Sequence, residues 1–362
     1  MNNNPRGTLT SQHELKQFLL FPVVFATLAL TFFVLIIWQQ LLLPLVMAIV
    51  IWYLIVTLAT AASKIPVLGR HLPPFFCYVL AFAFCIGTGW LVLSLITANI
   101  STLVQRLPDY EQRLAALGHS WLAFVGVDNP PDMTEMLGRF DLVSIVTAIA
   151  ALTRDIARNA GIILIYVMFL LWEHRSFDRK LSALISDKDR LSSARSLIQE
   201  IASQIQGYIR IKVGTSLLTA FSSYVVIKLV GIDFAEFWAL LIFVLNFIPF
   251  IGSVIATVFP CALALVQFDT ITPFIIVTAC LVTVQFFVGN ILEPKLMGNA
   301  FNLSGLVIIL SLAVWGQVWG IVGMFLCVPI MVMASIILAN FEATRPVAVL
   351  LSQNGRLKNG NK

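Results

Sequence analysis

The chain has 362 residues, of which 59% are apolar and 11% are charged, and its formal net charge is +5. Its mean hydropathy is +0.93. Soluble globular proteins carry about 25% charged residues, so this composition excludes an ordinary water-soluble fold. Several uncharged runs exceed the ~18 apolar residues that indicate a transmembrane helix. The sequence therefore predicts an all-α, polytopic membrane protein that sits in a lipid bilayer.

Residues 1–98 are predicted to form a polar tail and three spans. The spans are Phe18–Trp38, Leu41–Ala62 and Phe75–Ile100. The mostly polar tail is not followed by a short apolar region with a small-residue cleavage site, so the first run is interpreted as a permanent span and not as a signal peptide.

Residues 99–147 are predicted to be a small extracytoplasmic insert. The insert has three basic residues against six acidic ones, and poorly basic loops lie outside under the positive-inside rule. Arg106–Leu117 is typical of a short amphipathic helix, and Val125–Asp132 ("VGVDNPPD") contains turn signals. The insert is too short to be an independent enzyme domain.

Residues 148–172 are predicted to be the fourth span, which a charged "RDIAR" segment (Arg154–Arg158) interrupts. The apolar part after it rises only about 21 Å, less than the ~30 Å hydrocarbon core. Two interpretations remain open. Arg158 reaches the outer surface with Asp155 as its partner, or the helix lines a polar cavity.

Residues 173–212 are predicted to be a cytoplasmic amphipathic segment that runs into a fifth span, Val213–Val230. This segment contains eight basic residues, and apolar residues recur in it at three- and four-residue spacing. The positive-inside rule then places both termini, including the tail 342–362, in the cytoplasm. Because the basic residues flank spans without interleaved aromatic residues, no nucleic-acid partner is expected.

Residues 213–341 are predicted to be the transport region. Phe237–Phe268 and Leu296–Phe341 are uncharged and would be about 48 Å and 69 Å long as single helices. The first run must therefore tilt steeply or fold into two half-helices, and the second must turn back within the membrane or cross twice. Ile271–Leu292 has an ordinary spanning length. The charge placement favours six full spans and two re-entrant helical hairpins of opposite direction, with eight spans as the alternative.

The break in the first run is "NFIPFIG", which contains Asn246, Pro249 and Gly252. Proline removes a backbone donor and clashes with the preceding turn. The freed carbonyl groups need protein or water around them, because lipid cannot satisfy them. These three residues are therefore candidate substrate- or ion-binding residues, and a mere packing kink is the alternative.

A second candidate site is "GNILEPKLMGN", in which Asn290 and Glu293 share a helix face until Pro294 ends the helix. A carboxylate at the mouth of a span can bind a cation or a proton. An interfacial ion pair between Glu293 and Lys295 is the alternative. Two further amides complete the candidate binding set, Gln285 in the preceding span and Gln317 in the second broken run.

The break in the second run is "WGQVWGIVG", which contains Gly316, Gly320 and Gly323. Glycines four residues apart allow two helices to approach closely. These glycines, together with Pro294, are predicted to act in hinges or in packing.

Motifs for catalysis and for cofactors are not found in the sequence. It contains no phosphate-binding G-x-x-x-x-G-K-[ST] motif, and its four histidines are scattered without metal-ligand spacing. The five cysteines lie in apolar runs, where a thiol behaves as a small hydrophobe. We therefore expect no catalytic residues, no cofactor, no metal and no disulfide.

Three stretches in order, "LNFIPFIGSVIA", "GNILEPKLMG" and "LSGLVIILSLAVWGQVWGIVGMFLCVPI", resemble the autoinducer-2 exporter family of bacterial membrane proteins. The resemblance implies an inner-membrane homo-oligomer, with a pentamer as the implied assembly, that exports a small polar signal furanone. Some relatives resemble sodium/proton antiporters. The "RDIAR" segment departs from the more neutral helix of the family. The family motifs fall on Asn246, Pro249, Gly252, Asn290, Glu293, Pro294 and Gly298.

Three functions are therefore carried forward. The first is export of a small polar solute, such as an autoinducer-2-like quorum-sensing signal, through the two broken runs. The second is sodium- or potassium/proton antiport that uses Glu293 and the "RDIAR" segment. The third is a membrane scaffold without transport activity, in which the polar breaks only pack subunits together.

Overall fold

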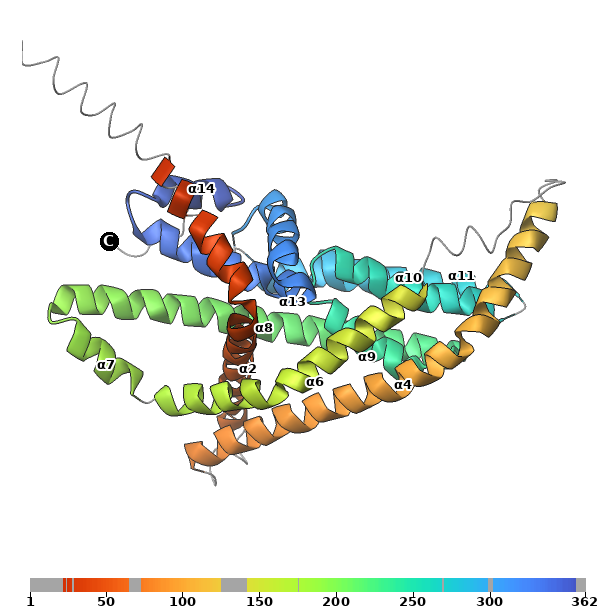
Figure 1. Cartoon of the computed structure of the whole chain (residues 1–362), viewed down its shortest axis with the longest axis horizontal. Helices are drawn as coiled ribbons and strands as arrows, with labels where there is room; N and C mark the ends of the chain where they lie inside the picture. The colour runs from red at the N-terminus through yellow and green to blue at the C-terminus, as the bar shows by residue number, and fades with distance from the viewer. Residues whose placement is uncertain are drawn as a thin grey trace, which may run out of the picture.

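The computed structural model describes residues 22–23, 25–27, 29–64, 73–124, 142–174, 176–268, 270–298 and 302–355. These residues are nearly all helical and contain no strand (Figure 1). Five of the helices are long and apolar enough to cross a membrane, or six if a bent pair counts as one span. The prediction of an all-α polytopic membrane protein is confirmed. The turn predicted at Val125–Asp132 lies outside the described residues.

The first half of the chain forms a bundle of α2 (Gln39–Ser63), α4 (Pro74–Phe124) and α6 (Leu142–Glu173). Small side chains at the crossings let the three helices approach closely, as is usual between helices in lipid. A shorter apolar helix, Phe25–Ile37, precedes α2. The buried core of this bundle consists of Ala48, Ile55, Ala59, Cys77, Ala81, Ile163 and Val167.

Helix α4 is longer than predicted. Its 51 residues form one helix, about 77 Å long at 1.5 Å per residue. The amphipathic segment Arg106–Leu117 is therefore a continuation of the third span and not a separate short helix. The change from apolar to amphipathic composition does not coincide with a helix end, which is why the composition suggested a boundary.

Helix α6 likewise runs through the "RDIAR" segment without a break, and Arg154 and Arg158 are exposed on it. The side chain of Asp155 lies outside the described residues. A short helix, α7 (Phe177–Leu184), then joins α6 to α8 (Lys188–Val230) at one end of the molecule (Figure 1).

Helix α8 is the longest element of the second half of the chain, with 43 residues. It begins at Asp187, whose carboxylate accepts hydrogen bonds from the backbone N–H groups of Asp189 and Arg190. It ends at Gly231, whose φ of 85° is the left-handed conformation that glycine adopts at a C-cap. Residues 188–212 of the predicted amphipathic segment and the predicted fifth span are thus one continuous helix, while Phe177–Leu184 of that segment forms the separate helix α7.

The first broken run is a helical hairpin, formed by α9 (Ala235–Leu245) and α10 (Ile251–Gln267). The two arms run antiparallel, because the rings of Trp238 on α9 and Phe259 on α10 stack with their centroids 6.2 Å apart. The side chain of Gln267, at the end of α10, is hydrogen-bonded to the chain just before α9 and so holds together the open end, or base, of this hairpin. It donates to the carbonyl of Gly231 at 2.9 Å and accepts from the backbone N–H of Asp233 at 2.8 Å.

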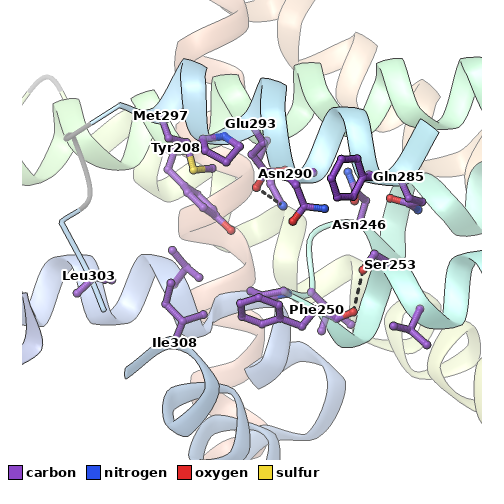
Figure 2. Close-up of a pocket in the computed structure, with 18 of the residues that line it drawn as sticks. Tyr208, Asn246, Phe250, Ser253, Gln285, Asn290, Glu293, Met297, Leu303 and Ile308 are labelled. Carbon is purple, nitrogen blue, oxygen red and sulfur yellow. Dashed lines mark hydrogen bonds and ion pairs between the residues drawn. The ribbon is translucent and has the colours of Figure 1, made fainter. Parts of the chain in front are cut away.

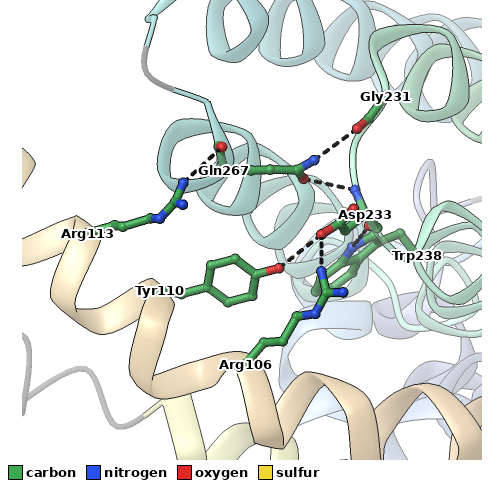
Figure 3. A network of polar contacts seen from close by, with 7 residues as sticks. All are labelled: Arg106, Tyr110, Arg113, Gly231, Asp233, Trp238 and Gln267. Carbon is green, nitrogen blue, oxygen red and sulfur yellow. Dashed lines mark hydrogen bonds and ion pairs between the residues drawn. The ribbon is translucent and has the colours of Figure 1, made fainter.

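Helix α4 contacts this base through a polar network (Figure 3). Arg106 Nη1 lies 2.7 Å from Asp233 Oδ2, and the Tyr110 hydroxyl donates to the same oxygen at 3.2 Å. Burial raises the pKa of the Tyr110 phenol above its usual value, so this hydroxyl remains a donor at neutral pH. Arg113 Nη1 donates to the carbonyl of Gln267 at 3.3 Å. The far part of α4 therefore holds the base of the first hairpin.

We expect Gln267→Ala to destabilise the protein more than Arg106→Ala. The first change leaves a half-buried N–H and a carbonyl without their partner, which costs about 1–3 kcal/mol. The second removes an ion pair whose side chains are 52% and 35% exposed, and such pairs contribute about 0.2–1 kcal/mol. Thermal unfolding of the two purified variants in detergent measures the difference, and the reverse order would contradict this account of the base.

The second broken run is also a hairpin, although the pattern of backbone hydrogen bonds assigns it to a single helix, α13 (Gly305–Asn340). Trp319 and Gly320 leave the helical conformation, and Gly320 has a φ of 61°. The Ser311 hydroxyl donates to the carbonyl of Cys327 at 3.2 Å. In a straight helix these residues would be about 24 Å apart. The arms, residues 305–318 and 321–340, therefore fold back on each other.

Both hairpin tips depend on a glycine at the same place in the turn. A Cβ added to Gly252 would lie 1.8 Å from the carbonyl oxygen of Leu245, and one added to Gly323 would lie 1.9 Å from that of Trp315. In each case the start of the returning arm touches the backbone at the end of the first arm. A residue with a side chain has no room at either position. Each break therefore has a glycine at a close contact between its two arms; packing was predicted for Gly323, and substrate or ion binding for Gly252.

The first arm of each hairpin is too short to cross a bilayer. Helix α9 has 11 residues and rises about 17 Å, and residues 305–318 rise about 21 Å, against a core of ~30 Å. These lengths favour two re-entrant hairpins over the alternative of eight spans.

The two hairpins pack on different parts of α8. The base of the first lies at Gly231, where α8 ends, while the second packs on Ile205 and Tyr208 in its first half. Their tips meet, because the rings of Phe247 and Phe325 stack with centroids 4.8 Å apart. Two hairpins of opposite direction were predicted from the charge placement.

Candidate functional site

A pocket of about 730 Å³ lies where the tip of the first hairpin, the second hairpin, the segment between the two hairpins and helix α8 meet. That segment consists of α11 (Thr272–Phe286), a π-helix labelled η1 (Phe287–Leu292) and α12 (Glu293–Met297). Figure 2 shows polar side chains from this segment pointing toward the hairpin tip across the cavity.

The π-helix explains how Pro294 is accommodated. In an α-helix the proline ring would clash with the carbonyl four residues earlier, that of Asn290. The wider π-turn moves this carbonyl away, and the N–H of Glu293 bonds the carbonyl of Val288, five residues earlier. The prediction that Pro294 ends the helix is therefore wrong. The chain stays helical to Met297, and Asn290 and Glu293 line the same pocket, as their spacing predicts.

A buried ion pair forms one wall of the pocket. Lys212 Nζ on α8 lies 2.6 Å from Glu293 Oε1, and the two side chains are only 7% and 15% exposed. This geometry contradicts the alternative interpretation, an interfacial pair between Glu293 and Lys295. The Glu293 carboxylate faces α8, and Lys295 is exposed. Glu293 and Lys295 are two residues apart in a helix, so their side chains lie on different faces.

Lys212 belongs to a stripe of buried polar residues on α8 that the sequence analysis missed. The stripe repeats every three or four residues, so it occupies one helix face. Thr215 donates to the carbonyl of Lys212 at 3.2 Å, and Thr219 to that of Thr215 at 2.9 Å. The helix backbone thus satisfies these hydroxyl groups, and their small size lets the hairpins pack closely. The stripe consists of Lys212, Thr215, Ser216, Thr219 and Ser223.

The tip of the first hairpin is attached to this stripe and is strained. Asn246 is 7% exposed, and its Nδ2 donates to Ser216 Oγ at 3.1 Å. Phe250, which lines the pocket, has a φ of 60°, a conformation that is rare for a bulky residue. Such strain persists only where the surroundings enforce it and is concentrated at functional sites.

The structure brings together most of the residues that the sequence nominated. Gly252 lies at the close contact behind the tip, and Gln317, Gly316, Gly320 and Gly323 belong to the break of the second hairpin, outside this pocket. Gln317 is exposed. Arg154 and Arg158 do not line the pocket either. The nominated residues that line it are Asn246, Pro249, Gln285, Asn290, Glu293 and Pro294.

The lining of the pocket has the chemical character that suits a small polar molecule without a net charge. Amides and hydroxyls on its wall, such as Asn290, Gln285 and Ser253, offer both donors and acceptors. The only charged groups among its described lining residues, Lys212 and Glu293, neutralise each other. Apolar residues supply the remaining surface, as in most small-molecule sites. Among the described residues, no group of three His, Cys, Asp or Glu side chains is arranged to hold a metal.

Residues 25–343 match the family described as "AI-2E family transporter". The chain belongs to the AI-2E transporter family. This AI-2E transporter is therefore a multi-pass membrane transporter, and its apolar helices place it in a lipid bilayer. The match extends from the helix before α2 to the end of the second hairpin, so it includes every element that lines the pocket except the segment at Gln353.

Individual relatives of this AI-2E transporter are similar over most of their length. "AI-2 transport protein TqsA" of Escherichia coli K12 is 30% identical over 267 residues, covering 72% of this chain and 76% of TqsA. YhhT of the same strain, also named as a transport protein, is 29% identical over 267 residues, 72% of this chain and 74% of its own. A protein of Borreliella burgdorferi, again named as a transport protein, is 28% identical over 321 residues, 87% of this chain and 86% of its own.

Proposed function

We propose that this protein exports a small polar solute across the bacterial inner membrane and that the pocket between the hairpins binds this solute. One observation carries the proposal: polar side chains from a strained hairpin tip and from a π-helix converge on a cavity inside a membrane transporter. Irregular backbone at membrane depth is tolerated where it lines a cavity. Broken helices form the substrate sites of many secondary transporters.

An autoinducer-2-like quorum-sensing signal is the proposed solute. The name of TqsA, which is 30% identical to this chain, describes it as an AI-2 transport protein. A cavity of about 730 Å³ is within the ~300–1,000 Å³ range of small-molecule sites. The donors and acceptors on its wall suit a hydroxylated furanone, and the neutral ion pair suits a solute without net charge.

The proposed orientation has both termini in the cytoplasm. Basic residues are concentrated in α7 and the first part of α8, which supports this orientation under the positive-inside rule. We further propose a homo-oligomer, with a pentamer as the assembly that the family resemblance implies. Native mass spectrometry of the detergent-solubilised protein tests the subunit number, and cysteine labelling of each terminus in intact cells tests the orientation.

A flux measurement tests the proposed function. Purified protein in vesicles is expected to move the labelled furanone signal down its gradient. Asn290→Ala removes an amide from the pocket wall, and losing one hydrogen bond of about 1.4 kcal/mol lowers the apparent affinity roughly tenfold. Gln317→Ala removes an exposed amide outside the pocket and is the matched control, with unchanged flux expected.

The two alternatives give different results in the same vesicles. Sodium- or potassium-dependent proton movement without solute flux would support an antiporter, and the absence of any flux would support a scaffold. Equal losses in Asn290→Ala and Gln317→Ala would remove the reason for assigning the solute to this pocket.

A further inference from the structure

The carboxylate of Glu293 is held where few water molecules can reach it. Its side chain is 15% exposed and that of Lys212 is 7% exposed, with 2.6 Å between Oε1 and Nζ. A buried carboxylate without a partner is strongly disfavoured, so it binds a cation, takes up a proton or forms an ion pair. In transporters, a carboxylate in such a position commonly holds the coupling cation or proton.

The described residues around Glu293 supply a single buried counter-charge. Arg210 on α8 is exposed, and its Nε donates to the carbonyl of Gln206 of its own helix at 3.4 Å. Lys295 on α12 is exposed as well. Lys212 is different, because α8 holds its backbone rigidly and its side chain reaches directly into the pocket wall.

We propose that the Lys212 ammonium takes the place of a soluble monovalent cation at Glu293, as a counter-ion tethered to α8. This inference rests on the proposed function in taking the pocket as the solute site. Its consequence is that the solute binds without a co-bound sodium or potassium ion. The Glu293 carboxylate becomes available to a cation only when the lysine charge is removed, and the amide side chains of Asn246 and Asn290 line the same pocket.

Cation-dependent thermal stability tests the proposal independently of transport. Wild-type protein in detergent is expected to have the same Tm in sodium, potassium and choline chloride at equal ionic strength. Lys212→Met keeps the aliphatic stem and removes the charge, so its Tm is expected to rise in sodium or potassium chloride by on the order of a few degrees relative to choline chloride. Choline is too large to enter a site built for a bare monovalent ion.

Three further variants make the result specific. Lys212→Arg keeps the positive charge and is expected to remain independent of the cation. The double variant Lys212→Met/Glu293→Gln has no buried charge and is expected to lose the response. Lys295→Met removes an exposed lysine two residues from Glu293 and is the matched control, with no response expected.

The proposal is overturned if Lys212→Met folds but shows no difference between sodium, potassium and choline. It is also overturned if the wild-type protein itself is stabilised by sodium or potassium and Glu293→Gln abolishes that effect. The second measurement does not require Lys212→Met to fold. Neither result depends on solute flux, so a failure here is distinct from a failure of the proposed function, which would appear as missing flux with the expected cation responses intact.

Discussion

Replacing Glu293 with glutamine is expected to lower the free energy of unfolding by about 3–5 kcal/mol. The change keeps the shape of the side chain but leaves Lys212 charged and buried, with 7% of its side chain exposed. Breaking one partner of a buried pair costs far more than the pair contributes, because the remaining charge has lost its compensation. Reversible unfolding in detergent, or in mixed micelles with added denaturant, measures this loss.

The matching double variant separates the charge effect from the shape effect. Lys212→Met/Glu293→Gln removes both charges, and its stability is expected to return to within about 1–2 kcal/mol of the wild type, since neutral replacement of a buried pair is often tolerated. Additive losses in the double-mutant cycle would contradict the view that the two groups act as one unit.

Substituting alanine for Gly252 is expected to have a comparable effect for a steric reason. The new Cβ would lie 1.8 Å from the carbonyl oxygen of Leu245 and 2.7 Å from its carbonyl carbon. Overpacking usually costs about 1–3 kcal/mol, and here the obstacle is backbone, which cannot change rotamer. We expect a loss of about 3 kcal/mol or more, with a displaced hairpin tip and loss of solute flux. Gly323→Ala is expected to behave alike, since its Cβ would lie 1.9 Å from the Trp315 oxygen.

Gly161→Ala is the control for this pair. Gly161 lies inside α6, and a Cβ there would meet nothing within 4 Å. Alanine in a helix interior is favoured over glycine by about 0.5–1 kcal/mol, so this variant is expected to be slightly more stable than the wild type. If thermal unfolding showed Gly252→Ala to be as stable as Gly161→Ala, the close contact at the hairpin tip would be disproved.

The positions of the two broken helices could be predicted because lipid imposes a strict rule on backbone polar groups. Proline, glycine and an amide inside an uncharged run cannot face acyl chains, so "NFIPFIG" had to lie against protein or a cavity. Length supplied the second constraint, since runs of about 48 Å and 69 Å do not fit across a ~30 Å core as single straight helices. Both constraints are local and can be read from one sequence.

The ion pair could not be predicted, because its partners are 81 residues apart. Lys212 stands at the end of a basic segment, where a lysine usually indicates only topology. One signal was available: Lys212, Thr215, Ser216, Thr219 and Ser223 repeat at helical spacing at the start of a span. A polar stripe of this kind faces protein and not lipid, which would have placed Lys212 inside.

The glycines illustrate the same limit at shorter range. The spacing of Gly316 and Gly320 predicts close approach in general, but not which glycine makes the contact or which backbone atom is approached. The contacts of Gly252 and Gly323 arise only after each run has folded back on itself. Gln317 was predicted to be a binding residue but does not line the pocket. The reason is related, because an amide beside a break can face either side of it.

Helix α4 belongs to two parts of the molecule at once. Its first half packs in the bundle with α2 and α6, and its far part is hydrogen-bonded to the base of the first hairpin. One continuous helix with these two attachments therefore connects the bundle to the base of the first hairpin. A change in membrane thickness or lateral tension that tilts the bundle is therefore expected to move the hairpin base as well, by a route that does not pass through the pocket between the hairpins.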